Sequence, residues 1–263
     1  MTTTEYHPEP ASPFVILTAV SLAFLVTCLL WAGFDDRTIS GTAVWAKPLK
    51  FAISFAVLFA TMALVEPYFS KPWRNGRMFA GIAAVMAASM LLEMIYMIAQ
   101  AAQMQTSHFN TATPFAGVMY ALMGVGAVCL VLGVGLMGWA AFRDKQASFG
   151  PGSRAGIAWG FGLSFVLTMI TAGTMSSMAG HFIGTPAPGA AVVPLMGWSA
   201  SVGDLRPVHF VSLHAMQVLP LLGLWIDRQG RSAGLIRGAA LIYVAVTMAL
   251  FVQALMGLPV IRL

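Results

Sequence analysis

Histidine and glutamate are scarce in this chain, and several of them lie within or beside long apolar runs. Glu93 lies inside one such run, and His209 and His214 lie five residues apart in another. A carboxylic acid inside a membrane costs a few kcal/mol and usually faces a partner or a cavity. Imidazole binds metals and exchanges protons near neutral pH. These residue types therefore predict a functional site rather than a packing role.

Polar residues recur along one face of the run that contains Glu93. Glu93, Tyr96, Gln100 and Gln103 are spaced i, i+3, i+7 and i+10. On a helix these four residues fall within an arc of about 80°. The polar stripe ends at the sequence TSHFN, which carries His108. We expect the stripe to lead toward that histidine at the outer surface of the membrane.

The run GDLRPVHFVSLHAMQ supplies the other main candidates. It places Asp204 and Arg206 at its outer end, with His209 and His214 deeper in the membrane. A separation of five residues is about 140° around a helix, so the two imidazoles cannot easily hold one ion as an i, i+4 pair does. We expect one of them to act as a ligand or base and the other to orient a partner.

Further candidates lie on the same side of the membrane. Lys50 lies at the outer end of the second apolar run, and His181 lies where the fifth run ends. The expected roles are catalysis by Glu93, Lys50 and Asp204, cofactor binding by His108, His209, His214 and Arg206, and metal ligation by His108, His181, His209 and His214.

The composition indicates that a membrane surrounds these residues. The chain has 263 residues, of which 59% are hydrophobic and 9% charged, against about 25% charged in ordinary soluble domains. The charged residues cluster between long apolar runs, so lipid is the expected solvent for those runs. The net charge of +5 comes from Lys and Arg at the ends of the runs, where membrane topology requires them. The charge therefore needs no nucleic-acid partner.

Seven apolar runs are long enough to cross a bilayer as helices. The alternating pattern of a membrane barrel is absent, and an open sheet would leave backbone groups unpaired in lipid. We therefore predict an all-α, seven-helix membrane protein forming a single domain over residues 1–263, with a lid loop at 179–207 on the outer face. The expected spans are about 14–34, 48–69, 78–104, 115–142, 155–178, 208–226 and 234–257.

Lys and Arg in the loops predict the orientation. Nine of the 14 lie on the side of the loops that follow spans two, four and six, and five lie on the other side. The positive-inside rule then puts the N-terminus in the cytoplasm and the C-terminus outside. The first residues, MTTTEYHPEPASP, contain acids where a signal peptide has a basic start, so we expect them to remain attached.

Three strings in the chain resemble those of an uncharacterised family of bacterial multi-spanning membrane proteins. They are WAKPLKFAISF, QTSHFN and GDLRPVHFVSLHAMQVLPLLG. The resemblance extends over most of the chain and implies a bacterial protein. Together with the seven spans, it predicts a multi-pass protein of the bacterial inner membrane.

The first functional hypothesis is a membrane-embedded haem- or metal-binding protein that takes part in quinol-type electron transfer. Two imidazoles can ligate the iron of haem b, and we expect His108 to pair with His209 or His214. Lys50 or Arg206 would lie near a haem propionate. The buried glutamate would then move protons for a quinone or another amphiphilic molecule.

Two alternatives stay open. Zn²⁺ held by His108, His209 and His214, with Glu93 or Asp204 as the base for water, would give a membrane hydrolase. The seven-helix membrane amidohydrolases are similar in outline, but their HxxxH pair is HxxxxH here. Cu is a further candidate metal, because methionine thioethers suit Cu(I). The other alternative is a non-enzymatic sensor or assembly subunit that binds a small molecule or metal under the lid.

Overall fold

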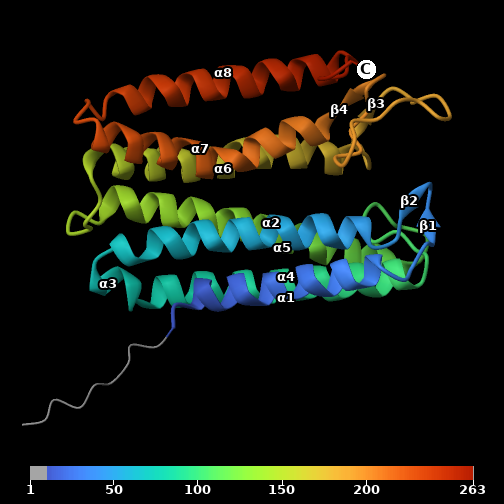
Figure 1. Ribbon diagram of the computed structural model, residues 1–263, viewed down its shortest axis with the longest axis horizontal. Helices are drawn as coiled ribbons and strands as arrows, with labels where there is room; N and C mark the ends of the chain where they lie inside the picture. Colours follow the sequence, from blue (N-terminus) through green and yellow to red (C-terminus); the bar gives the residue numbers. More distant parts are fainter. Residues whose placement is uncertain (1–10, 263) are drawn as a thin grey trace, which may run out of the picture. The chain divides into compact units, whose positions relative to one another are not determined.

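Long apolar helices make up most of the structure, a computed structural model that describes residues 11–262 (Figure 1). It is 69% helical with almost no sheet. Within the described residues, seven helices are long and apolar enough to cross a membrane, which confirms the predicted seven-helix architecture. They are α1 (Pro13–Ala32), α2 (Ala46–Val65), α4 (Arg77–Ala102), α5 (Pro114–Arg143), α6 (Pro151–Ser177), α7 (Leu205–Arg228) and α8 (Leu235–Leu255).

Short elements connect the long helices. A 3-10 turn, η1, and the four-residue helix α3 link α2 to α4, and two antiparallel pairs of two-residue strands lie in the loops before α2 and before α7. Their bounds are η1 (Glu66–Tyr68), α3 (Lys71–Arg74), β1 (Thr38–Ile39), β2 (Thr42–Ala43), β3 (Phe182–Ile183) and β4 (Gly203–Asp204).

Proline and hydroxyl residues fix where several helices begin. Pro13, Pro114 and Pro151 occupy the first turn of α1, α5 and α6, where the missing N–H breaks no helical hydrogen bond. The Thr113 hydroxyl accepts a hydrogen bond from the backbone N–H of Ala116 at 3.1 Å and so caps α5. The predicted spans differ from the helices by a few residues at each end, because the length of an apolar run does not record these caps.

The chain divides into two compact units, which we describe separately. The first unit contains the described residues through Pro67 together with Met90–Thr106, and so holds α1, α2 and the C-terminal part of α4. Helix α1 packs against α2, and the Ser21 hydroxyl in α1 donates to the sulfur of Met90 in α4 at 3.2 Å. Phe59 of α2 is fully buried in this unit.

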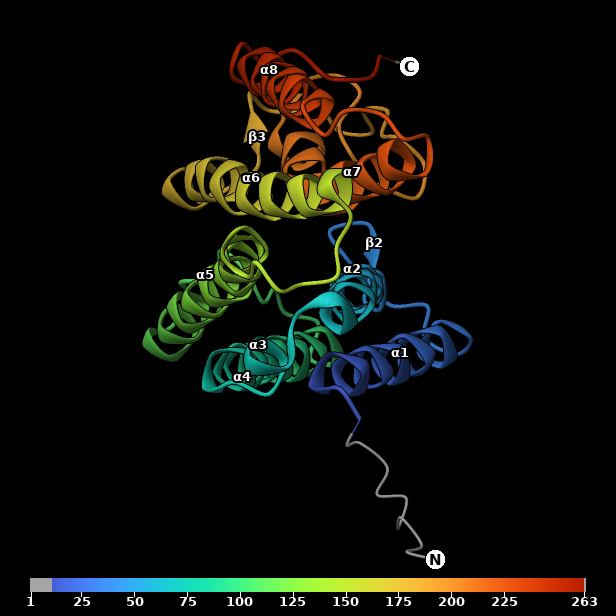
Figure 2. The same cartoon turned by 90° about the vertical axis from the view of Figure 1, so that its left-hand side faces the viewer.

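The second unit contains residues 68–89 and 107–262. It holds the N-terminal part of α4 and the helices α5, α6, α7 and α8. Helix α5 packs against α6, and α6, α7 and α8 contact one another side by side, as both views of the structure show (Figures 1 and 2). All four histidines that the structure describes belong to this unit.

Glycines spaced four residues apart bring α6 and α7 into backbone contact. A Cβ added to Gly152 would lie 2.6 Å from the carbonyl oxygen of Gly223, and one added to Gly156 would lie 2.4 Å from that of Leu219. Gly160 makes a similarly close approach one turn later. Small residues at every fourth position let membrane helices approach this closely. We call Gly152, Gly156 and Gly160 the glycine seam; it fixes the register of α6 against α7.

The long loop between α6 and α7 is tied down at its ends and within. Strand β3 pairs with β4, with Phe182 opposite Asp204, and Val192 pairs with Ser199 inside the loop. Helix α7 begins at Leu205, so the loop ends a few residues before the predicted limit of 207. We call residues 179–204 the lid.

Candidate histidine site

His209 on α7 faces a hydroxyl on α6. Its Nδ1 lies 3.4 Å from Oγ1 of Thr171, a long hydrogen bond. The Thr171 hydroxyl also lies 3.1 Å from the carbonyl oxygen of Leu167 in its own helix. Because a carbonyl only accepts, the hydroxyl donates to Leu167 and accepts the Nδ1–H of His209. This arrangement assigns the His209 lone pair to Nε2.

His214, one turn further along α7, has the same tautomer for a different reason. Its Nδ1 lies 2.7 Å from the carbonyl oxygen of Phe210, which can only accept a hydrogen bond. The imidazole also stacks on the ring of Phe210, with centroids 3.9 Å apart and an angle of 28° between the planes. The ring is therefore oriented with its lone pair on Nε2.

The imidazoles of His209 and His214 lie five residues apart on α7 and are held by different groups. Their Nδ1 atoms bond to different elements, the side chain of Thr171 on α6 and the backbone of α7 itself. The two rings are thus held separately, in keeping with the spacing of five residues. Within residues 11–262, no group of three or more His, Cys, Asp or Glu residues is arranged to hold a metal ion.

Hydroxyl groups continue the seam of small residues on α6 toward His209. Ser164, one turn after Gly160, donates to the carbonyl oxygen of Leu213 on α7 at 2.9 Å. Thr168 follows one turn later and is 3% exposed. Its Oγ1 is buried and has no hydrogen-bond partner among the described residues. In sequence Thr168 lies between Ser164 and Thr171, whose hydroxyls contact Leu213 and His209 of α7, so this hydroxyl is buried in the same stretch of α6.

Helix α8 adds a further buried polar group. The Tyr243 hydroxyl donates to the carbonyl oxygen of Val211 on α7 at 2.6 Å, and Thr247 is fully buried with its hydroxyl donating to the carbonyl of Tyr243 at 2.8 Å. Ser164, Thr168 and Tyr243 were not among the residues predicted from the sequence. The sequence does carry one indication of Ser164 and Thr168, because small residues recur at every fourth position from 152 to 168.

Asp204 and Arg206, predicted as a base and a cofactor contact, hold the lid. Asp204 is fully buried, and its carboxylate accepts from the backbone N–H of Ser199 at 2.8 Å and from the Arg206 guanidinium at 2.6 Å. The guanidinium also donates to the carbonyl oxygen of Gly197 at 2.7 Å and lies 5.1 Å from the ring centre of Phe182. The pair thus joins the start of α7 to both halves of the lid.

His108 lies in the loop before α5. Its Nδ1 is 3.1 Å from the Ser107 hydroxyl, and its ring centre is 6.4 Å from that of Tyr120 on α5. The Tyr120 hydroxyl in turn lies 3.4 Å from that of Ser176 near the end of α6. His181 lies at the start of the lid, with its ring 4.1 Å from that of Phe182. Ligation by these two histidines stays a prediction.

Glu93 and the lysines belong to the first unit. Glu93 is 4% exposed and interacts electrostatically with Lys47 at the start of α2, while Lys50 is exposed. One turn beyond Glu93, the Gln100 amide donates to the Tyr96 hydroxyl at 2.5 Å, and both side chains are buried. The predicted polar stripe is therefore a buried face as far as Gln100. A shared site with the α7 histidines stays a prediction.

Comparison with protein families, with curated proteins and with solved structures gives no match to this chain. The candidate site contains two imidazoles with an acceptor beside Nδ1, a buried hydroxyl that has no partner among residues 11–262, and an apolar surrounding.

Proposed function

We propose that this protein is a multi-pass redox protein of the bacterial inner membrane that binds a quinol-type amphiphile beside the α7 histidines. One observation carries the proposal, the hydrogen-bond acceptor that lies beside Nδ1 of both His209 and His214. Both Nδ1 atoms have an acceptor, so both Nε2 atoms carry a lone pair. A neutral imidazole with a lone pair can accept the proton of a quinol hydroxyl near neutral pH.

Thr168 supplies the complementary group on α6. A buried polar atom left without a partner costs about 1–3 kcal/mol, and the Thr168 hydroxyl is in this position among residues 11–262. A ligand oxygen that accepts its hydrogen bond would remove this cost. Quinols and quinones carry oxygens on opposite sides of one ring, so the same ring can bond to a hydroxyl on α6 and an imidazole on α7.

His209 is the proton acceptor in this proposal. Thr171 holds its Nδ1–H, so an arriving proton binds at Nε2 and gives an imidazolium that is still oriented by Thr171.

Haem b is the second candidate ligand, and the orientation of His214 favours it. A ligating imidazole usually donates its other ring N–H to a carbonyl or carboxylate, as His214 does to Phe210 at 2.7 Å. His214 would therefore hold the haem iron through Nε2, with His108 as the expected second ligand. Haem supplies one-electron transfer when bound, which is the chemistry that quinol oxidation needs. Arg206, an expected propionate contact, is already engaged by Asp204.

The zinc hydrolase has less support. The zinc centre needs three histidines close together, and no such group of ligands is found within residues 11–262. Asp204, an expected base for water, uses its carboxylate to hold the lid. No contact of the described residues specifically favours Cu. If the protein binds a small molecule or metal without oxidising or reducing it, the alternative function is a sensor or an assembly subunit.

Two measurements on protein purified into lipid nanodiscs test the proposal. Calorimetric titration with a short-chain quinol analogue should show binding that Thr168→Val and His209→Ala each weaken about tenfold, the loss expected for one good hydrogen bond. Thr174→Val is the matched control, because the Thr174 hydroxyl donates to the carbonyl of Ile170 in its own helix at 2.8 Å. A visible spectrum should show a Soret band that His214→Ala removes if haem is bound.

Three results would count against the redox function. If Thr168→Val and His209→Ala bind the quinol as tightly as the parent protein does, the binding site does not lie at the α6–α7 interface. No quinol binding at all, together with a colourless preparation, favours the sensor or assembly class. A haem spectrum that His214→Ala leaves unchanged moves the haem to other ligands.

A further inference from the structure

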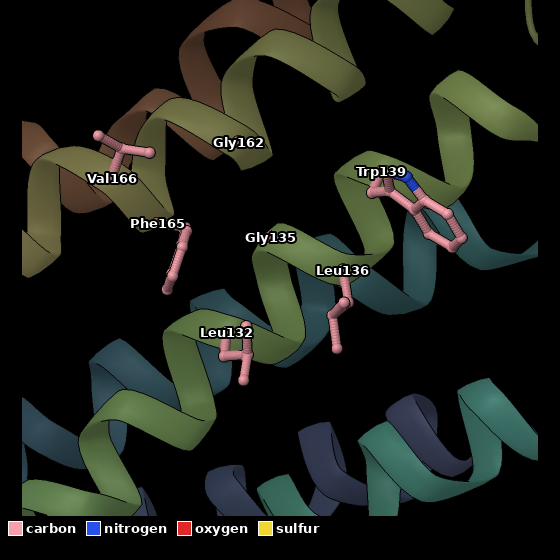
Figure 3. A pocket seen from close by; sticks show the side chains of 7 residues that line it. All are labelled: Leu132, Gly135, Leu136, Trp139, Gly162, Phe165 and Val166. Atoms are coloured by element: carbon pink, nitrogen blue, oxygen red, sulfur yellow. The ribbon is translucent and has the colours of Figure 1, made fainter.

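A groove on the exposed surface of the second unit runs between α5 and α6. It has a volume of about 410 Å³ and an almost purely apolar lining, in which Phe165 of α6 points toward α5 and Trp139 lies at one end (Figure 3). Trp139 and Val166 are each close to half exposed. The lining residues are Leu132, Gly135, Leu136, Trp139, Gly162, Phe165 and Val166.

Two cations lie at the end of α5 next to this groove. Arg143 and Lys145 line an open hollow of about 530 Å³ together with Phe142. Asp144 stands between them in sequence but is 3% exposed, and its carboxylate accepts from the backbone N–H of Ser70 at 2.7 Å. Asp144 does not line the hollow, and its carboxylate is bonded to Ser70 instead of to the two flanking cations.

Trp139 connects the groove to the basic hollow. It lines the groove, and the guanidinium of Arg143, one turn later on α5, lies 5.7 Å from its ring centre. Tryptophan is enriched where a membrane helix meets the headgroup layer. One face of α5 therefore presents first an apolar channel, then an interfacial aromatic ring, and then two positive charges.

We propose that this face binds one anionic phospholipid, with its phosphate at Arg143 and Lys145 and one acyl chain in the groove. The positive charge of the hollow complements a phosphate, and basic pockets beside membrane helices are known lipid headgroup sites. From Trp139 to Leu132 the groove follows α5 for about 10 Å, enough for a substantial part of an acyl chain. This site is independent of the histidine site.

Gly162 offers a way to fill the groove without disturbing the fold. A Cβ at Gly162 meets no atom within 4 Å, so Gly162→Leu places a side chain where the acyl chain would lie. Gly124 on α5 is also open around its Cβ and does not line the groove. Gly124→Leu is therefore the matched control for added apolar bulk.

Arg231 provides the matched control for charge. Its guanidinium lies 5.0 Å from the ring centre of Trp225, an arginine–tryptophan pair like that of Arg143, but neither residue lines the groove. Native mass spectrometry of the full chain would count bound phosphatidylglycerol, cardiolipin and phosphatidylcholine. Size-exclusion chromatography and circular dichroism would check that each variant is folded.

We expect one anionic phospholipid to remain bound while phosphatidylcholine is lost. The double variant Arg143→Gln, Lys145→Gln should weaken anionic lipid binding at least tenfold, and Gly162→Leu should weaken it severalfold with the charges intact. Arg231→Gln and Gly124→Leu should bind as the parent does. Equal retention of phosphatidylcholine, an equal loss in Arg231→Gln, or full binding by Gly162→Leu would each overturn the proposal. If the double variant fails to fold, the difference in anionic lipid binding between Gly162→Leu and Gly124→Leu tests the proposal by itself.

Discussion

The carboxylate of Asp227, at the end of α7, accepts hydrogen bonds from the backbone N–H groups of Gly152 and Ser153 at the start of α6, each at 2.7 Å. The Ser153 hydroxyl adds a third bond at 2.6 Å. One helix is thus capped by a side chain from its neighbour. Because the positive end of the α6 dipole meets a negative charge there, this contact anchors the α6–α7 pair at the end opposite the lid.

Removing this cap should destabilise the second unit. We expect Asp227→Ala to lower the free energy of unfolding by about 1–2 kcal/mol, the usual cost of losing an N-cap. Asp36→Ala, at an exposed aspartate, is the control and should change the stability little. Thermal or denaturant unfolding in detergent would measure both. An equal effect of the two variants would show that the cap does not matter.

Thr168→Val should stabilise the ligand-free protein. Valine has nearly the same shape as threonine but no hydroxyl, so the substitution removes a buried polar atom that has no partner among residues 11–262. We expect a gain of about 1 kcal/mol in the free energy of unfolding. Thr171→Val, which removes the group facing His209, should instead destabilise. The two unfolding curves would move in opposite directions.

The Asp204–Arg206 pair should stabilise the folded conformation of the lid and have little effect on the stability of the helices. Asp204→Asn removes the charge that holds Arg206 and weakens the acceptor for the Ser199 N–H. We expect backbone amides of residues 184–200 to exchange hydrogen about tenfold faster, because a buried charge pair loses one partner. Exchange in α6 and α7 should stay slow. Thr185→Ala, at an exposed lid residue, should leave the exchange pattern unchanged.

The loop after α1 should respond to acid at unusually low pH. The Arg37 guanidinium, and then the Trp31 indole N–H at 2.7 Å, hold the pKa of the Asp35 carboxyl well below its usual value of 3.8. A carboxyl with a lowered pKa in the folded state stabilises the fold above its unfolded-state pKa, and this contribution is lost as the pH falls through the folded-state pKa. Its stabilisation is therefore complete at neutral pH and disappears only in strong acid.

Trp31 fluorescence would measure this titration, with a Trp31→Phe variant used to subtract the other tryptophans. The Trp31 signal should stay constant at neutral and mildly acidic pH and change only well below the usual aspartate range. In Asp35→Asn the change should be absent. A midpoint at or above about 4, the ordinary aspartate value, would contradict the lowered pKa.

The sequence predicts the seven helices because lipid leaves the backbone few alternatives. It predicts the helix ends less well, since caps such as Thr113 depend on single residues at the edges of an apolar run. The β1–β2 and β3–β4 pairs were missed, because strands of two residues are too short to show an alternating pattern. Terminal orientation rests on the loop charges and stays a prediction.

The sequence indicates only part of the surroundings of the candidate site, for a related physical reason. Periodicity along one helix places His209 and His214 on α7, but it does not reveal which helix lies opposite. Thr168 therefore gave no signal by itself, although it continues the spacing of the glycine seam. Asp204 was predicted as a base, yet an aspartate just before a helix is also the usual N-cap, and that is how it acts in the structure.

The glycine seam has a consequence for how this protein can evolve. At Gly152, Gly156 and Gly160 the atoms that meet across the interface include main-chain carbonyl oxygens of α7, which every amino acid possesses. The apolar side chains of α6 that face lipid can therefore change in size and shape while the pairing of the two helices persists. Tolerance to substitution along α6 should rise and fall with a period of four residues, lowest where a hydrogen is the largest side chain that fits.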